Sequence, residues 1–160
     1  MRKKKKGKKG YVGLKINMAK AYDHIEWDFL VAVMRSTRFS QKCKNLIFKC
    51  ISYVSFAVLL NDSPCQTFSP HLGLRQGDHL SPYLFILCAE VFSGLFIKAK
   101  EEKALHGLSI ARGAPTTSHL FFADDSLIFC RDSLEDAQAV NKILDLCQSA
   151  SGQLINLDKS

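Results

Sequence analysis

The sequence predicts an α+β fold, and three observations support this prediction. Residues 11–17 alternate enough between apolar and other residues to form a strand. Residues 118–130 place two apolar arms on either side of adjacent aspartates, Asp124 and Asp125, a pattern that suits a hairpin with a tight turn. Between and after these segments, apolar residues recur every three or four positions, which indicates helices. Strands interleaved with long helices are typical of an α+β fold.

Two helices are expected after the first strand. Trp27, Leu30, Val31 and Met34 fall three or four positions apart and would form one apolar stripe facing the core. Ser40 is expected to cap the second helix, because a serine hydroxyl can accept a hydrogen bond from a free backbone N–H of the first turn.

A hairpin and a long helix are expected next. Residues 55–60 and 64–68 predict two strands around a turn at Asn61-Asp62-Ser63, where glycine would suit the second turn position better than Asp62. Ser81 is expected to cap the long helix, with Pro82 at its first position.

The last third of the chain predicts a short strand over 108–110, the aspartate hairpin and a final helix. Ser133 with Asp136 three residues later is a capping pattern for this helix, and Gly152 is expected to end it. A strand over 154–157 would close the chain.

Charge divides the sequence into a tail and a body. Lys and Arg total 22 against 15 acidic residues, but the first ten positions hold seven of the basic ones, so residues 11–160 carry 15 of each sign. We expect residues 1–10 to be a disordered basic tail and residues 11–160 to be one domain. The tail is either a solvated end, a nonspecific contact for nucleic-acid phosphates or a nuclear address. Its basic residues are Arg2, Lys3, Lys4, Lys5, Lys6, Lys8 and Lys9.

Cysteine spacing and hydropathy suggest an intracellular protein, nuclear or cytoplasmic. Six cysteines lie far apart with no C-x-x-C pair, so we expect reduced thiols. The basic run leads into no apolar signal segment, and the apolar stretch from 83 to 96 is too short to span a membrane. The chain is therefore expected to be neither secreted nor membrane-bound. Four histidines show no metal-ligand spacing: His24, His71, His106 and His119.

Three segments, in order, resemble motifs A, B and C of the reverse transcriptases of LINE-type (non-LTR) retrotransposons, particularly those of plants. Motif A reads Asn17-Met18-Ala19-Lys20-Ala21-Tyr22, motif B reads Gly73-Leu74-Arg75-Gln76-Gly77-Asp78 followed by Leu80-Ser81-Pro82, and motif C is the aspartate hairpin. The resemblance covers nearly all of residues 11–160. It implies a polymerase palm, in which an antiparallel sheet is backed by helices, with incomplete fingers and no thumb.

The resemblance implies RNA-directed DNA polymerisation with two Mg²⁺ ions, for which Mn²⁺ could substitute. Carboxylates are the ligands that Mg²⁺ prefers, and Asp124 and Asp125 would supply two of them. In the family, the third carboxylate ligand comes from the first residue of motif A, which here is Asn17. Its amide oxygen can still bind a metal but brings no charge. Asp23, one position beyond the motif A aromatic, is a weaker candidate for the missing ligand.

The resemblance also implies sites for an RNA template, a DNA primer and deoxynucleoside triphosphates. Tyr22 stands where the family keeps an aromatic against the 2′ position of the sugar. Gln76 and Gly77 match the pair under the template base and incoming nucleotide, with Arg75 beside them as a phosphate contact. Residues 151–160 resemble the motif D region. Within them, Lys159 aligns with the candidate acid for the pyrophosphate leaving group, although it could equally be an ordinary surface lysine.

Three hypotheses follow. The first is a degenerate reverse-transcriptase remnant, inactive because Asn17 replaces aspartate and because fingers and thumb are missing. The second is a residually active RNA-directed DNA polymerase that uses the Asn17 oxygen with Mn²⁺ or a partner chain. The third is a non-enzymatic nucleic-acid-binding or interaction protein that uses the lysine tail on a palm scaffold.

Overall fold

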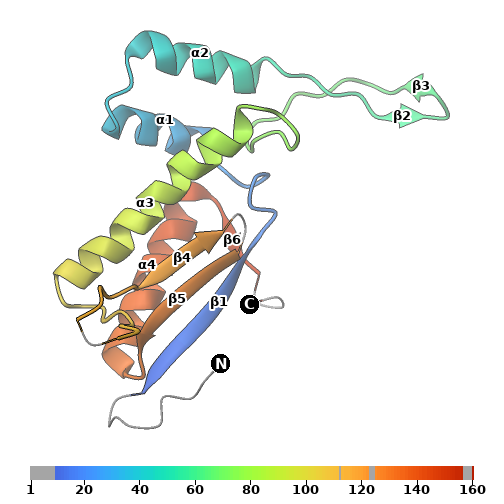
Figure 1. The fold of residues 1–160 in the computed structure, drawn as a ribbon. Helices are drawn as coiled ribbons and strands as arrows, with labels where there is room; N and C mark the ends of the chain where they lie inside the picture. The colour runs from blue at the N-terminus through green and yellow to red at the C-terminus, as the bar shows by residue number, and fades with distance from the viewer. Residues whose placement is uncertain (1–9, 112, 123–124, 157–159) are drawn as a thin grey trace.

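The computed structural model describes residues 10–111, 113–122, 125–156 and 160, and the expected basic tail therefore lies almost wholly outside the described residues. Helices are interspersed along the chain with strands that form an antiparallel sheet, which confirms the α+β prediction (Figure 1). The elements in order are β1 (Tyr11–Ala19), α1 (Trp27–Ser36), α2 (Gln41–Ser52), β2 (Leu59–Leu60), β3 (Ser63–Pro64), α3 (Ser81–Glu101), β4 (His119–Phe122), β5 (Asp125–Arg131), α4 (Leu134–Ser151) and β6 (Leu154–Ile155).

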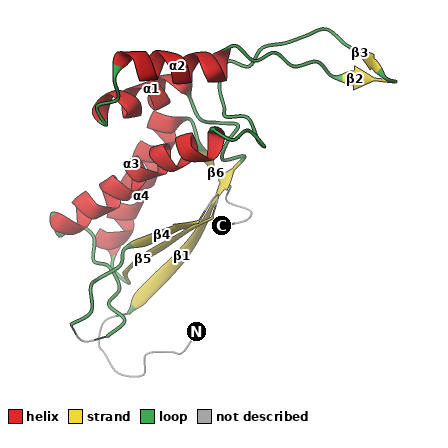
Figure 2. Ribbon diagram, turned by 45° about the horizontal axis from the view of Figure 1, so that its top comes forward, coloured by secondary structure: helices red, strands yellow, loops and turns green. Residues whose placement is uncertain are grey.

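The main sheet has the strand order β4-β5-β1-β6, and its neighbouring strands pair antiparallel. The first strand of the chain is thus an inner strand, bordered by strands that come more than a hundred residues later (Figure 2). In the β1–β5 register, Asn17 lies opposite Asp125 and Lys15 lies opposite Leu127. This register joins the motif A strand to the motif C hairpin.

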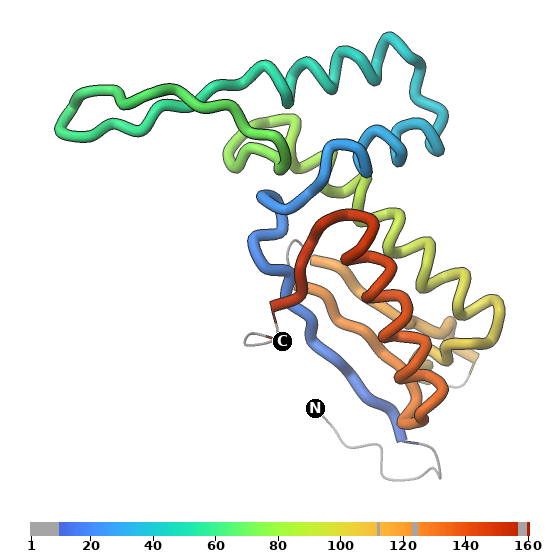
Figure 3. The backbone as a smooth tube through the Cα atoms, turned by 180° about the vertical axis from the view of Figure 1, so that it is seen from behind, coloured from blue at the N-terminus to red at the C-terminus, as the bar shows by residue number. Residues whose placement is uncertain are grey.

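Helices α3 and α4 pack on one face of this sheet (Figure 3). Because successive side chains of a strand point to opposite faces, Ile16 of β1 and Ile128 of β5 are buried against the helices. Phe96 of α3 and Val140 of α4 are each 1% exposed in the same core. The opposite face of the sheet is open, and it carries Lys15, Asn17 and Asp125. We call strands β1, β4, β5 and β6 together with α3 and α4 the palm layer.

Helix α1 bridges the palm layer to a projecting segment, residues 41–70, which contains α2 and the β2–β3 hairpin (Figures 1 and 2). Leu30 and Met34 of α1 are fully buried, whereas none of the twelve residues of α2 is buried. The hairpin lies farther out still. The projecting segment therefore adds little to the buried core.

The hairpin is present where the sequence predicts it, but its strands are shorter. Each strand has two residues, and one further bridge joins Phe56 to Phe68. The turn residues Asn61 and Asp62 have φ of 49° and 60°, the mirror-image turn geometry that matches strand twist. Asparagine and aspartate tolerate this geometry better than most residues, which explains how the turn forms without glycine.

Helix caps agree with the sequence at two of three positions. The Ser40 hydroxyl accepts a hydrogen bond from Cys43 N, and the Ser133 hydroxyl accepts one from Asp136 N. The prediction that Ser81 caps α3 is wrong, because Ser81 is the first residue of that helix. A carboxylate oxygen of Asp78 instead accepts hydrogen bonds from the backbone N–H groups of Leu80 and Ser81.

Asp136 secures the start of α4 and is fully buried. One carboxylate oxygen accepts hydrogen bonds from the backbone N–H groups of His106, at 3.0 Å, and Arg131, at 2.9 Å. The other contacts His106 Nδ1 at 3.0 Å and accepts a bond from the Ser133 hydroxyl at 3.2 Å. Burial favours the neutral acid, but the hydrogen bonds outweigh it and lower the pKa of Asp136. His106 is therefore a structural partner rather than a bystander.

Two strand predictions are only partly confirmed. The expected strand over 108–110 is a single bridge between Leu108 and Thr117. The closing strand is Leu154–Ile155, and position 157 lies outside the described residues.

Helix α3 is longer than the apolar stretch that the sequence showed. It has 21 residues and contains an 18-residue window with a mean hydropathy of 1.5, so it would suffice in length and composition to cross a membrane. In the fold, however, α3 contacts α1, α4 and β4, and it supplies six buried residues, of which Phe92 and Phe96 are two. These contacts are those of a core helix.

Candidate active site

Asn17 and Asp125 meet on the open face of the sheet, near the end of β1 and at the start of β5. They are paired residues in the β1–β5 register, and Asn17 Nδ2 donates a hydrogen bond of 3.1 Å to Asp125 Oδ1. Since a carboxylate can only accept, the amide group must turn its nitrogen toward Asp125. The motif A and motif C positions predicted from sequence are therefore in direct contact. Asp124, the other motif C aspartate, lies outside the described residues.

Lys15 completes the surroundings of the Asp125 carboxylate. It lies two positions before Asn17 on the same face of β1, and its ammonium is 3.1 Å from Asp125 Oδ2. The Asn17 amide first, and the Lys15 ammonium second, hold the pKa of Asp125 below its ordinary value. Both oxygens of this carboxylate thus already have a partner.

The end of the chain approaches the same place. The backbone oxygen of Asn17 accepts a hydrogen bond of 2.8 Å from Asn156 N, and its backbone N–H donates to the Ser160 hydroxyl at 3.2 Å. The segment that resembles motif D therefore lies beside the motif A strand. Lys159, the expected proton donor, lies outside the described residues.

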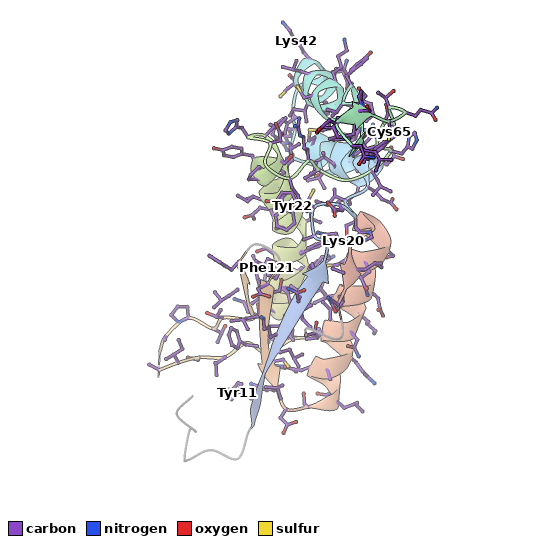
Figure 4. All side chains as sticks on the ribbon, turned by 90° about the vertical axis from the view of Figure 1, so that its right-hand side faces the viewer. Tyr11, Lys20, Tyr22, Lys42, Cys65 and Phe121 are labelled. Atoms are coloured by element: carbon purple, nitrogen blue, oxygen red, sulfur yellow. The ribbon has the colours of Figure 1, made fainter. Side chains whose placement is uncertain are left out.

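Tyr22 lies in the turn that follows β1, between the sheet and the helices above it (Figure 4). Its ring stacks on Phe85 of α3, with ring centroids 4.8 Å apart and an interplanar angle of 10°. Its carbonyl accepts a hydrogen bond of 2.8 Å from Leu74 N. The preceding carbonyl, of Ala21, accepts one of 2.8 Å from the buried amide of Gln153. The aromatic of motif A is thus held by both the motif B and the motif D segments.

Gly73 fixes the start of the motif B loop against this turn. Its N–H donates to the Ile25 carbonyl at 2.8 Å, and its carbonyl accepts a bond of 2.8 Å from the indole of Trp27. Its φ of 86° favours glycine, and a Cβ here would stand 2.7 Å from the backbone oxygen of Asp23. This glycine is required by close backbone packing.

The polar side chains of the loop contact residues from two other segments. Gln76 Nε2 donates a hydrogen bond of 3.2 Å to Asp23 Oδ1, which places Asp23 beside motif B. The Arg75 guanidinium lies 5.8 Å from the centre of the Phe56 ring at the base of the hairpin, within the range of a cation–π contact. Arg75 therefore connects the loop to the projecting segment.

An open cavity of about 690 Å³ lies above the turn, and four residues predicted from sequence line it: Tyr22, Arg75, Gln76 and Gly77. Gly77 has a φ of 81°, yet a Cβ at this position would have no atom within 4 Å. This glycine, unlike Gly73, faces free space. A second cavity of about 600 Å³ shares Arg75 and Gln76 and extends toward the hairpin. The loop thus separates two hollows of a size that could hold a nucleotide and a neighbouring base.

The reverse transcriptase (RNA-dependent DNA polymerase) family model matches residues 1–160. The chain belongs to the reverse transcriptase family. Members of this family bind a nucleic-acid template and primer and generally use divalent metal ions.

Two comparisons agree with this assignment. The reverse transcriptase chain is 48% identical over 77 residues to an uncharacterized mitochondrial protein of Arabidopsis thaliana, covering 48% of this chain and 62% of that protein. Its fold resembles the structure of apo telomerase from Candida tropicalis truncated from the C-terminal domain, with a TM-score of 0.66 and 15% identity. That match covers 98% of this chain and 32% of the telomerase chain. The chain spans less than two thirds of either relative, and the telomerase likeness is one of fold.

The metal ligands expected of a reverse transcriptase do not fit well among the described residues. No group of three His, Cys, Asp or Glu side chains that could hold a metal ion occurs within the part of the chain that the structure describes. At the motif A position an amide replaces a carboxylate, and its nitrogen donates a hydrogen bond to Asp125, so it brings no negative charge to a cation there. Asp23 Oδ1 accepts a hydrogen bond from Gln76 beside motif B, and its role as a substitute ligand stays a prediction.

Sequence reasoning missed Lys15. The signal was available, because side chains two positions apart in a strand share a face, and Lys15 is two positions from Asn17. Gln153 was also missed, and here no sequence pattern indicates which amide will be buried. Tyr22, Arg75, Gln76 and Gly77 lie together as expected, while their roles in binding stay predictions.

Proposed function

We propose that this reverse transcriptase domain is the palm part of a LINE-type retroelement polymerase whose nucleotidyl transfer is strongly impaired. The observation that supports this is the direct contact between Asn17 and Asp125. This contact supports the assignment of position 17 as the place from which a carboxylate would face the motif C hairpin. The assignment to the LINE type is supported by the order and spacing of the three motif segments in the sequence.

The impairment follows from charge. A unit charge at about 4 Å contributes roughly 4 kcal/mol at an effective dielectric near 20, before solvent reduces it. Loss of about 4 kcal/mol of transition-state stabilisation corresponds to on the order of a thousandfold in rate. Asn17 removes such a charge from the place where Asp125 already has two partners. We expect Mg²⁺ to bind poorly and polymerisation to be very slow.

The binding surfaces for nucleotide and template are proposed to be retained. Tyr22 is stacked on Phe85 at the edge of the 690 Å³ cavity, a position suited to contact a sugar. Gly77 leaves open space where a side chain would project, as expected where a base or nucleotide approaches the backbone. Arg75 and Gln76 line the same cavity. RNA template, DNA primer and deoxynucleoside triphosphates are therefore the proposed partners.

Primer extension on an RNA template tests this function. The natural chain, Asn17→Asp and Asn17→Asp/Asp124→Ala would each be assayed with Mg²⁺ and then with Mn²⁺. We expect no measurable extension by the natural chain, recovery in Asn17→Asp, and loss of that recovery in the double variant. Extension by the natural chain would instead establish a residually active polymerase, the second hypothesis from sequence.

A second candidate function rests on the charge distribution. Seven basic residues lie among the first ten, while the rest of the chain has equal numbers of acidic and basic residues. We propose that this cluster binds nucleic acid through phosphates without base specificity. Deletion of residues 1–10 should then abolish binding to labelled RNA at moderate salt while circular dichroism stays unchanged. Full binding by the shortened chain would contradict this role.

A further inference from the structure

The Asp125 carboxylate is enclosed by two groups from one strand. Asn17 is its paired residue in the register, and Lys15 is the diagonal neighbour two positions away on the same face. Asn17 Nδ2 lies 3.1 Å from Asp125 Oδ1, and Lys15 Nζ lies 3.1 Å from Asp125 Oδ2. The two contacts share a strand and a face, so they form together whenever β1 pairs with β5.

The charges at this point differ from those of a cation site. Asp125 contributes one negative charge, Lys15 one positive charge and Asn17 none, so these three side chains are neutral together. A divalent cation binds where carboxylate oxygens are free and negative charge accumulates. Here an approaching cation meets an ammonium group already bound to one oxygen of the carboxylate. Like charges at such distances repel each other.

We propose that Lys15 is a resident counter-cation of Asp125, which takes the position of a divalent ion and lowers the affinity of this site for metal. The proposal rests on the proposed function and deepens it, because it makes the loss of metal affinity depend on Lys15 as well as on Asn17. Lys15 is a positioning residue that acts through Asp125. Asn17→Asp alone then restores only part of the affinity.

The exposure of the pair sets the size of the effect. The side chains of Lys15 and Asp125 are 54% and 42% exposed. Water and salt therefore weaken their attraction, as they do for other surface ion pairs. The lysine competes with a cation without excluding it completely. We expect a three- to tenfold effect on affinity at low ionic strength and a smaller one at high ionic strength.

Mn²⁺ binding to the full chain, followed by the EPR signal of free Mn²⁺, tests the proposal without an activity assay. The variants are Asn17→Asp alone and Asn17→Asp combined with Lys15→Met, Lys15→Arg or Lys142→Met. Lys142 lies on the exposed surface of α4, and its replacement changes the net charge by the same amount away from the site. Circular dichroism verifies that each variant is folded.

Lys15→Met should tighten Mn²⁺ binding three- to tenfold relative to Asn17→Asp alone. Lys142→Met should change it less than twofold, and Lys15→Arg should leave it low because arginine keeps the charge. Equal affinities of the Lys15→Met and Lys142→Met variants, or no gain in either, would overturn the role of Lys15. If Asn17→Asp binds no more tightly than the natural chain, the proposed function fails instead, so the two failures are distinguishable.

Discussion

The palm layer and the projecting segment are built from the same kinds of residues but bury them very differently. In the palm layer and α1, Leu30, Phe96 and Ile128 are at most 1% exposed. In the projecting segment, Leu59 and Leu60 are 68% and 65% exposed, and α2 has no buried residue. The candidate site lies between the two regions, with the motif B loop in contact with both. A rigid support on one side and a weakly packed segment on the other suit the proposed role of this site in binding a template.

Among these variants, removal of the buried Asp136 carboxylate in the palm layer should cause the largest loss of stability. Asp136→Ala leaves the backbone N–H groups of His106 and Arg131 without their partner at the start of α4. We expect the free energy of unfolding to fall by about 4 kcal/mol, the loss typical of a broken buried network. Urea unfolding measures it. Asp145→Ala, on the exposed surface of the same helix, is the control and should change stability by less than about 0.5 kcal/mol.

The same carboxylate predicts a pH dependence. Hydrogen bonds lower the pKa of Asp136 in the folded state, so its contribution is fully present above the ordinary aspartate range and is lost as pH falls through the lowered value. Between pH 6 and pH 3, the urea midpoint of the natural chain should therefore fall more than that of Asp136→Ala. Parallel pH profiles of the two proteins would contradict this assignment.

A pair of leucine variants compares the two regions directly. Leu30 is fully buried in α1, whereas Leu59 is largely exposed in the hairpin. Leu30→Ala should lower the free energy of unfolding by about 3 kcal/mol because it leaves a cavity in the core. Leu59→Ala should change it by less than about 0.5 kcal/mol. Similar losses in thermal denaturation would mean that the projecting segment is covered in solution.

Two glycines of the motif B loop distinguish close packing from free space. Gly73→Ala adds a Cβ 2.7 Å from a backbone oxygen to an unfavourable positive φ, and we expect a loss of about 2 kcal/mol or more. Gly77→Ala should lower the free energy of unfolding by only about 1 kcal/mol, because the positive φ is its only source of strain. Its main effect should appear as weaker nucleotide binding, measured by fluorescence titration with a labelled deoxynucleotide. An equal stability loss in both variants would argue against the free space beside Gly77.

The smallest predicted loss of stability is confined to α2. Ser40→Ala removes the hydroxyl that accepts from Cys43 N, a cap that contributes about 1 kcal/mol. Because α2 packs outside the main core, amide hydrogen exchange should accelerate in α2 and stay unchanged in β1 and β5. Faster exchange in those strands as well would show that the two regions unfold together.

Local sequence signals predicted most of the elements, and the misses have physical reasons. Ser40, Ser133 and Gly152 mark helix ends as expected, since each acts on the backbone next to it. The strands on either side of the Asn61–Asp62 turn are shorter than predicted because no core lies beneath them. Local patterns cannot reveal whether such support exists.

For the candidate site, the motif resemblance predicted that Asn17 and Asp125 would lie together, and they do. It did not predict that Lys15 reaches the same carboxylate, because that contact depends on the register of two strands far apart in sequence. The cavity formed by the motif B loop likewise arises from three-dimensional packing. Sequence thus indicated that these two positions lie together, while their electrostatic surroundings required the fold.

The position of β1 in the sheet has a consequence for biosynthesis. Asn17 and Asp125 are 108 residues apart, so the ribosome must make most of the chain before β1 can pair with β5. At about 5–20 residues per second, this takes on the order of 5–20 seconds. During that interval the strand that carries Val12, Leu14 and Ile16 has no partner strand in the sheet. A chaperone that binds short apolar segments would find its target there first.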